Sequence, residues 1–253
     1  MLILFSKFHR RVTIGLVATV YFAIQLATCG QNNSIQQGNA AYAAGNFDAA
    51  AKLFANEIKL ASSAEAWSNW GNAEWQRGDH AAAVLAWERA RWINPTDTNA
   101  AANLRFARSS ASLNVPPLRW WESFSNFLSP NAWAWLAAES FWLVILVAVV
   151  LPMTLRWRRS AWSQSLAAFG LGFFLLALTG AYGVQTRARL VVVTAPAATL
   201  LQAPAAHAPV ASKLNAGDVA RTEFVRGDYV FVRTGTGDFG WLDKSQLHFI
   251  ARP

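Results

Sequence analysis

Apolar residues in this chain gather in three long blocks, at 12–29, 132–155 and 162–184, separated by stretches of ordinary polarity. The second and third blocks are each long enough to cross a hydrocarbon core of about 30 Å as a helix. Tryptophans stand at the ends of these two blocks, where indole rings favour the headgroup level of a membrane. The pattern therefore predicts two transmembrane helices.

The first block has the features of an export signal. Lys7, Arg10 and Arg11 precede it, and residues 1–29 contain no acid. Cys29 ends a stretch that approximates a lipobox, so lipidation of Cys29, ordinary cleavage next to it and an uncleaved N-terminal anchor are three alternatives. Each of them puts the chain that follows outside the cytoplasm.

The short loop between the other two blocks, 156–161, carries Arg156, Arg158 and Arg159 and no acid. Loops rich in Lys and Arg stay in the cytoplasm. We therefore expect this loop to be cytoplasmic and both flanking domains to lie on the opposite side, in agreement with the export signal.

Polar and small residues inside the two spans are candidates for function or packing. Glu139 lies about two helical turns inside the first span. It is an intramembrane site candidate, or else a carboxylate that reaches the outer interface. In the second span, Ala168 with Gly172 and Thr179 with Gly183 form small-xxx-small pairs that permit close helix approach. The expected partner is the first span, and a partner protein is the alternative.

Residues 64–97 carry large and small side chains at a fixed spacing: Trp67, Trp70, Gly71, Gly78, Ala83, Trp87, Ala90 and Pro95. This spacing resembles the tetratricopeptide (TPR) repeat, in which Gly78 would end the first helix and Pro95 the second. The pattern recurs 33 residues earlier, at Gly38, Gly45, Ala50 and Phe54. Region 31–108 is therefore predicted to contain stacked TPR helices with a capping helix at 98–107.

TPR proteins usually bind protein segments on the concave face made by the first helices of the repeats. That face maps to Asn39, Tyr42, Asn69, Asn72, Trp75 and Gln76. Asn39 and Asn69 match the asparagines of the carboxylate-clamp class, but Ile35, Asn99 and Asn103 replace its basic residues. We expect a partner-binding face without carboxylate recognition, or else residues that pack against the neighbouring repeat.

Residues 109–131 are predicted to be a linker with an interfacial pair, Trp120 and Trp121. Short β-rich runs then follow in residues 185–253, at Leu190–Thr194, Val219–Phe224, Tyr229–Thr234, Phe239–Leu242 and Leu247–Ile250. With Gly240-Trp241 opening a strand and a variable loop at Ala195–Ala211, this tail resembles the bacterial SH3-like domain. Trp241 is expected in its core.

Composition supports a membrane protein. Of the 253 residues 54% are hydrophobic and 14% charged, against about 25% charged in ordinary globular proteins. The net charge is +8, and segments 1–29, 132–162 and 163–189 contribute +3, +2 and +2 of it. A nucleic-acid-binding protein would concentrate this charge on a folded domain, so we expect no nucleic-acid partner.

Candidate chemistry is sparse. A single cysteine excludes an internal disulfide and a Cys-rich zinc site. The four histidines stand alone, at His9, His80, His207 and His248. They offer neither a nucleophile–base pair nor a metal-ligand spacing. We expect no catalytic residues, metal or cofactor, and a protein that is not an enzyme.

The order of a signal, TPR helices, two close spans and an SH3-like tail resembles the Bat (aerotolerance) group, in its BatE-like type. The fold class expected is a multidomain membrane protein with all-α TPR helical repeats, two transmembrane helices and a small all-β SH3-like barrel. The resemblance implies an accessory protein of the bacterial inner (cytoplasmic) membrane, with periplasmic or extracytoplasmic domains. Its partners would be von Willebrand A-domain Bat proteins and a MoxR-type ATPase. The leading hypothesis is a scaffold with a protein-binding TPR groove, and the alternative is a peptidoglycan-binding module acting through the tail.

Overall fold

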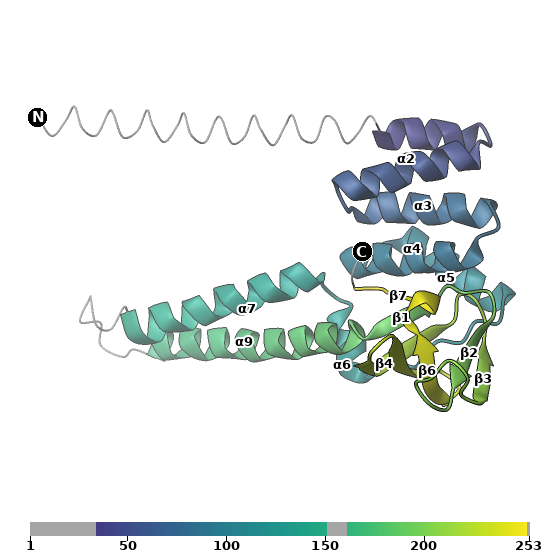
Figure 1. Ribbon diagram of the computed structural model, residues 1–253. Helices are drawn as coiled ribbons and strands as arrows, with labels where there is room; N and C mark the ends of the chain where they lie inside the picture. The colour runs from purple at the N-terminus through teal and green to yellow at the C-terminus, as the bar shows by residue number, and fades with distance from the viewer. Residues whose placement is uncertain (1–33, 151–160, 252–253) are drawn as a thin grey trace, which may run out of the picture.

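The computed structural model describes residues 34–150 and 161–251. It contains a stack of helices, a hairpin of two long apolar helices and one antiparallel sheet (Figure 1). The predictions for the export signal and Cys29, and for the loop arginines Arg156, Arg158 and Arg159, concern positions outside the described residues.

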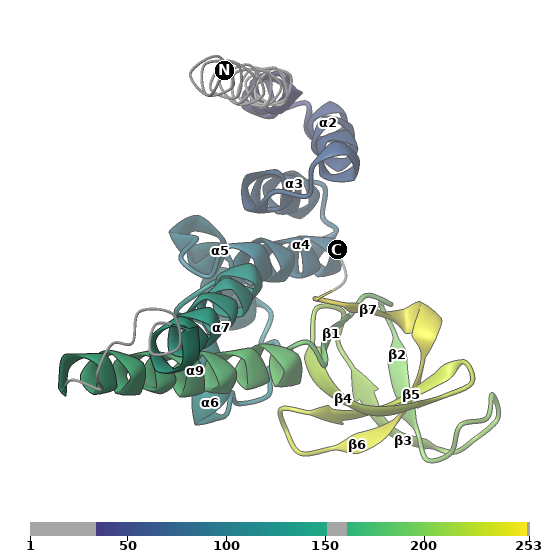
Figure 2. The same cartoon turned by 90° about the vertical axis from the view of Figure 1, so that its left-hand side faces the viewer.

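The helical stack is made of consecutive helices that lie one above the other (Figures 1 and 2). They are a helix at 34–43, α2 (Phe47–Leu60), α3 (Ala64–Gln76), α4 (His80–Ile93) and α5 (Thr98–Ser110). Side-chain oxygens cap the N-termini of the four labelled helices, from Asn46, Ser63, Asp79 and Asp97. These caps fix where each helix begins, because they satisfy backbone N–H groups that have no partner inside the helix.

One contact recurs in the stack at two equivalent places. A Cβ on Gly38 would lie 2.5 Å from the ring of Phe54, and a Cβ on Gly71 would lie 2.7 Å from the indole of Trp87. The second glycine follows the first by 33 residues, from 38 to 71, and the second aromatic residue follows the first by the same number, from 54 to 87. In each case glycine lets a following helix bring an aromatic ring against the backbone. The repeat seen in the sequence therefore corresponds to a repeated contact between glycine and an aromatic ring.

The apolar hairpin follows the stack. The short helix α6 (Trp120–Ser125) leads into it, and its elements are α7 (Pro130–Ile145), η1 (Leu146–Val150) and α9 (Ala161–Arg187). Two stretches, Pro130–Val149 and Gln164–Arg187, are long and apolar enough to cross a membrane. Only 17% and 22% of their most apolar windows are buried. That exposure distinguishes them from the buried core helices of a soluble protein.

The hairpin projects from the rest of the chain in one direction (Figure 1). The beginning of α7 and the end of α9 lie together beside α6, next to the sheet and the stack. Of the predicted interfacial pair, Trp120 is 68% exposed, whereas Trp121 is half-buried with its ring centroid 6.1 Å from that of Tyr182. The stack, which precedes the hairpin, and the sheet, which follows it, therefore lie at the same end of the hairpin.

The C-terminal part is a curved seven-stranded antiparallel sheet with strand order β3-β2-β6-β5-β4-β1-β7. The strands are β1 (Leu190–Val193), β2 (Ala198–Leu201), β3 (Val210–Leu214), β4 (Val219–Arg226), β5 (Tyr229–Thr234), β6 (Phe239–Asp243) and β7 (Leu247–Phe249). All five predicted runs are strands. The stretch Ala195–Ala211 was expected to be a loop, and this was wrong: it contains β2 and the start of β3. β2 alternates buried and half-buried residues and places Leu200 in the core of the sheet.

The sheet and the stack share a hydrophobic core. β1 is buried along its whole length. Val191 and Val193 point into the sheet, while Leu190 and Val192 belong to a cluster with Trp87 and other residues of α4 and α5. A strand covered on both faces is a continuous apolar run rather than an alternation. The regions predicted as separate domains, 31–108 and 185–253, are therefore packed against each other.

Residues 109–131, predicted to be a linker, take part in this packing. The Asn114 backbone N–H donates to Asp218 Oδ1 at 2.8 Å, and the Val219 N–H donates to the Asn114 carbonyl at 2.9 Å. Leu113 and Val115 pack against the shared core. The segment thus joins the stack to the sheet before it reaches the hairpin.

Candidate functional site

The predicted partner-binding residues lie on the helix at 34–43, which carries Asn39 and Tyr42, and on α3, which carries Asn69, Asn72, Trp75 and Gln76. Amide side chains connect these helices in a line. Asn69 Nδ2 donates to Asn39 Oδ1 at 3.3 Å, and Asn103 Nδ2, from α5, donates to Asn72 Oδ1 at 2.7 Å. We call Asn39, Asn69, Asn72 and Asn103 the asparagine row. It runs across every second helix of the stack.

The predicted residues divide into two kinds by their contacts. Asn72 Oδ1 also accepts from Trp87 Nε1 at 3.0 Å. Trp75 stacks on His80 with ring centroids 4.2 Å apart and is half-buried. Both side chains therefore help to hold the stack together. Asn39 and Gln76 are exposed, and Tyr42 is half-buried in an edge contact with Phe47.

Glu139 is exposed on α7 and lies beside Trp135 and Trp142 in an open apolar hollow on that helix. The face of α7 that meets α9 is a different one. It places Trp133 against Gly180 and Val144 against Gly170.

The small residues of α9 are not all used as the sequence pattern predicted. A Cβ on Gly180 would overlap the indole of Trp133, whereas a Cβ on Gly172 would meet nothing within 4 Å. Ala168 and Gly172 line an open hollow of α9 with Phe169 and Phe173. The contact of α9 with α7 is therefore made at Gly170 and Gly180, and Gly183 packs against Trp121 and Ser125 of α6. The prediction that the first span is the partner of the 168/172 pair was wrong, because those positions face another side of the helix, and a partner protein stays the alternative there.

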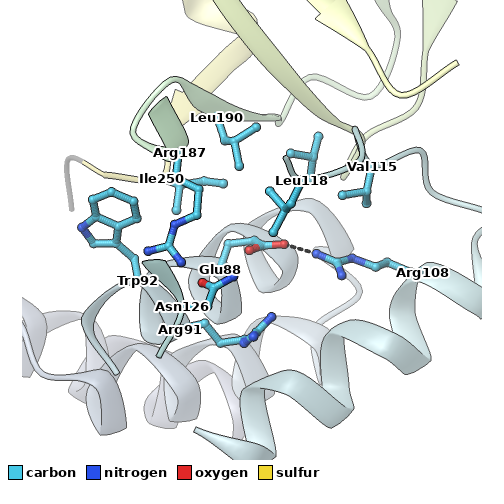
Figure 3. Close-up of a pocket in the computed structure, with 11 residues that line it drawn as sticks. Glu88, Arg91, Trp92, Arg108, Val115, Leu118, Asn126, Arg187, Leu190 and Ile250 are labelled. Carbon is cyan, nitrogen blue, oxygen red and sulfur yellow. Dashed lines mark hydrogen bonds and ion pairs between the residues drawn. The ribbon is translucent and has the colours of Figure 1, made fainter. Parts of the chain in front are cut away.

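A cavity of about 140 Å³ lies where the stack, the hairpin and the sheet meet, and we call it the junction cavity (Figure 3). It is lined by residues from all three parts: Glu88, Arg91, Trp92, Arg108, Val115, Leu118, Asn126, Arg187, Leu190, Val219 and Ile250. Leu190 and Ile250 lie on the side toward the sheet, Glu88, Arg91 and Trp92 lie on the side toward the stack, and Arg187 reaches in from the end of α9.

The charged lining is dominated by arginine. Arg108 Nη2 is paired with Glu88 Oε1. Arg187 is only 5% exposed and lies over the ring of Trp92, with its guanidinium carbon 5.0 Å from the ring centroid. Among the described residues, no atom accepts a hydrogen bond from Arg187 Nε or Nη2, nor from Nε of Arg91 and Arg108.

Next to the cavity, Glu122 of α6 is completely buried and paired with Arg221 of β4. Burial alone would raise the pKa of the carboxyl group. The hydrogen bonds from Arg221 and from the Arg119 backbone N–H outweigh burial, so the pKa of Glu122 is below its ordinary value.

Sequence reasoning did not find these residues. It counted Arg187 only within the charge of segment 163–189 and gave Glu122 no role. The available signal was an arginine at the end of a long apolar helix. Its burial depends on contacts with α4, which precedes it by many residues.

The outer face of the sheet carries aromatic residues in register. Phe224 pairs with Phe231, and Phe231 with Trp241, across β4, β5 and β6. The rings of Phe224 and Phe231 are stacked, with centroids 4.7 Å apart. Trp241 is 8% exposed, but it is covered by Phe224 and Phe231 on this outer face and does not belong to the core cluster of the sheet. Phe224 and Phe239 are 51% and 60% exposed. We call Phe224, Phe231, Phe239 and Trp241 the aromatic ladder.

Over residues 34–150 and 161–251, no three or more His, Cys, Asp or Glu side chains gather in a way that could hold a metal ion. Comparison with known proteins gives no family: no protein-family model matches the chain, and no curated protein matches it significantly.

Proposed function

We propose that this protein is a membrane-anchored scaffold on the extracytoplasmic face of a bacterial inner membrane. In this proposal the stack is a TPR array, the curved sheet is an SH3-like barrel, and α7 and α9 are the anchor. The TPR groove binds a segment of a partner protein, and the chain acts as an accessory to a Bat/MoxR-type membrane complex with von Willebrand A-domain partners.

The asparagine row is the observation that supports the binding role most directly. Side-chain amides are aligned across alternate helices. Asn39 in the row and Gln76, which also lies on α3, are exposed. Amides both donate and accept hydrogen bonds, so they suit the backbone of an extended peptide. The recurring glycine–aromatic contact supports a repeat array as the frame for this face.

The direction of the hairpin supports the placement of the domains. Because the parts that flank α7 and α9 lie at one end of the hairpin, a membrane crossed by both helices leaves them on one side (Figure 1). In the sequence, the arginines between the two spans favour a cytoplasmic position for that segment.

Site-specific photo-crosslinking in cells tests the groove. A photo-reactive amino acid at Gln76 of the full-length chain should give a discrete adduct with one membrane protein, identified by mass spectrometry. The matched control is Lys52, exposed on α2 and outside the asparagine row. The same adduct from both positions, or none from Gln76 in a chain that reaches the membrane folded, would contradict the proposal.

The aromatic ladder favours one alternative, a peptidoglycan-binding module. Exposed aromatic rings aligned across neighbouring strands form an apolar patch of the kind that marks binding sites. Because the sheet shares a core with the stack, the test uses the detergent-solubilised full chain and purified cell-wall sacculi. Co-sedimentation should fall in a Phe224→Ala, Phe239→Ala double variant and persist in Leu60→Ala, which removes a still more exposed apolar side chain from α2. No sedimentation of the wild type would exclude this alternative.

A further inference from the structure

The junction cavity contains more positive than negative charge. Its lining has three arginines, Arg91, Arg108 and Arg187, and one acid, Glu88. Glu88 is already paired with Arg108. The nearest other carboxylate, that of Glu122, is held by Arg221. Both carboxylates attract the charge of Arg187, but among the described residues neither forms an ion pair or a hydrogen bond with it.

Of the three arginines, Arg187 has the most nitrogens without a hydrogen-bond acceptor in residues 34–150 and 161–251. Its guanidinium group is buried, and Trp92 covers one of its faces. Two of its nitrogens, Nε and Nη2, lack an acceptor in the described part of the chain. Water could accept hydrogen bonds from them, but it would bring no negative charge. Arginine keeps its proton in proteins, and a buried charge without a partner is strongly unfavourable.

We propose that the junction cavity binds a phosphate oxyanion at Arg187. Arg187 and Arg108 approach from opposite sides of the cavity, with Glu88, the ion-pair partner of Arg108, between them (Figure 3). Guanidinium groups bind phosphate through paired hydrogen bonds. A volume of about 140 Å³ accommodates a tetrahedral anion and ordered water.

The position of the cavity allows two sources for this phosphate. Arg187 is the last residue of the apolar stretch Gln164–Arg187, so the site lies at the level of lipid headgroups when α9 crosses a bilayer. The anion is the phosphate of an anionic lipid headgroup or free inorganic phosphate. In either case it would tie α9 to α4 and α5 and strengthen the contact of the hairpin with the stack.

Thermal unfolding of the full chain tests the site. In a phosphate-free, non-ionic detergent, sodium phosphate should raise the unfolding midpoint relative to sodium chloride at equal ionic strength. The expected rise is about 3 °C at ten times the dissociation constant. A parallel series in nanodiscs compares phosphatidylglycerol with phosphatidylcholine.

Three variants make the assignment specific. Arg187→Met removes the buried charge, so it should abolish the anion-dependent rise without lowering the midpoint in phosphate-free buffer. Glu88→Gln removes the competing acid and should tighten binding by about tenfold; it tests the site independently if Arg187→Met does not fold. Arg233→Met, at an exposed ion pair on the sheet, should leave the rise unchanged.

Each outcome decides the proposal. A rise with free phosphate that Arg187→Met abolishes supports the site and identifies the free anion. A rise with phosphatidylglycerol alone, again abolished by Arg187→Met, supports it and identifies the lipid headgroup. No anion-dependent rise in the wild type, or a rise that neither Arg187→Met nor Glu88→Gln alters, overturns it.

Discussion

Arg221 and Glu122, far apart in the chain, form a two-pronged ion pair in which Arg221 Nη2 donates to Glu122 Oε2 at 2.9 Å and Nη1 donates to Oε1. The Arg119 backbone N–H donates to the same Oε2 at 2.8 Å. The carboxylate thus accepts the hydrogen bond of the backbone N–H that caps α6, and it joins that helix to β4. Because α6 leads directly into the hairpin, this pair sets where α7 begins relative to the sheet.

Replacing Glu122 by Gln should destabilise the protein by about 3 kcal/mol, because it leaves Arg221 charged and mostly buried without a counter-charge. Denaturant unfolding of the detergent-solubilised chain measures the change. The control is Glu223→Gln, which breaks the exposed pair with Arg233 and should cost less than about 1 kcal/mol. Equal losses in the two variants would contradict a central role for the buried pair.

The same pair predicts a pH dependence. The pKa of Glu122 is lowered in the folded protein, so its contribution is fully present above the ordinary glutamate pKa of about 4.3. The contribution is lost as the pH falls through the lowered folded-state value, because the unfolded chain then binds more protons. Unfolding midpoints measured from pH 7 to pH 3 should fall more steeply for the wild type than for Glu122→Gln. Parallel curves would count against the lowered pKa.

Two glycines of α9 should respond differently to the same substitution. Gly180→Ala should loosen the contact with Trp133, because the added Cβ has no room there, at a cost of about 1 to 3 kcal/mol. Gly172→Ala should be neutral or slightly stabilising, since that position is open. Thermal unfolding in detergent compares the two variants, and a larger loss for Gly172→Ala would show that α7 and α9 pack through another face.

Asn72 and Asn39 should also differ. Asn72→Ala removes the acceptor of Trp87 Nε1 and of Asn103, so it should destabilise the stack by about 1 to 3 kcal/mol. Asn39→Ala affects one exposed hydrogen bond and should change stability by less than about 0.5 kcal/mol. Circular dichroism during denaturant unfolding measures both. Binding experiments should therefore use Asn39 and Gln76, because a loss of partner capture in Asn72→Ala would be ambiguous.

Local patterns predicted a large part of this fold. The apolar blocks marked both helices of the hairpin, and five β-rich runs each became a strand. These features depend on neighbours within a few residues, through hydrophobic length and side-chain preference. β2 was missed because its two leucines lie between alanines and prolines, and its burial comes from pairing with β3 and β6 rather than from its own composition.

The relations between parts were not predictable in the same way. The sequence indicated no partner for Glu122, and its carboxylate binds Arg221 from a distant part of the chain. Similarly, the run Leu190–Val193 indicated a strand without showing what covers its second face. Such contacts are decided by the packing of whole elements. A single sequence contains no distance information between them.

The passage from α9 to β1 has a mechanical consequence. Arg187 ends the helix and Leu190 begins the strand, and both intervening residues are hydrogen-bonded back to α9, through Ala188 N–H to Val184 and Arg189 N–H to Thr186. A helix that can cross a bilayer therefore passes directly into a strand that packs between the rest of the sheet and the stack. A change in the tilt of α9 would move the stack, and with it the asparagine row, in the same direction.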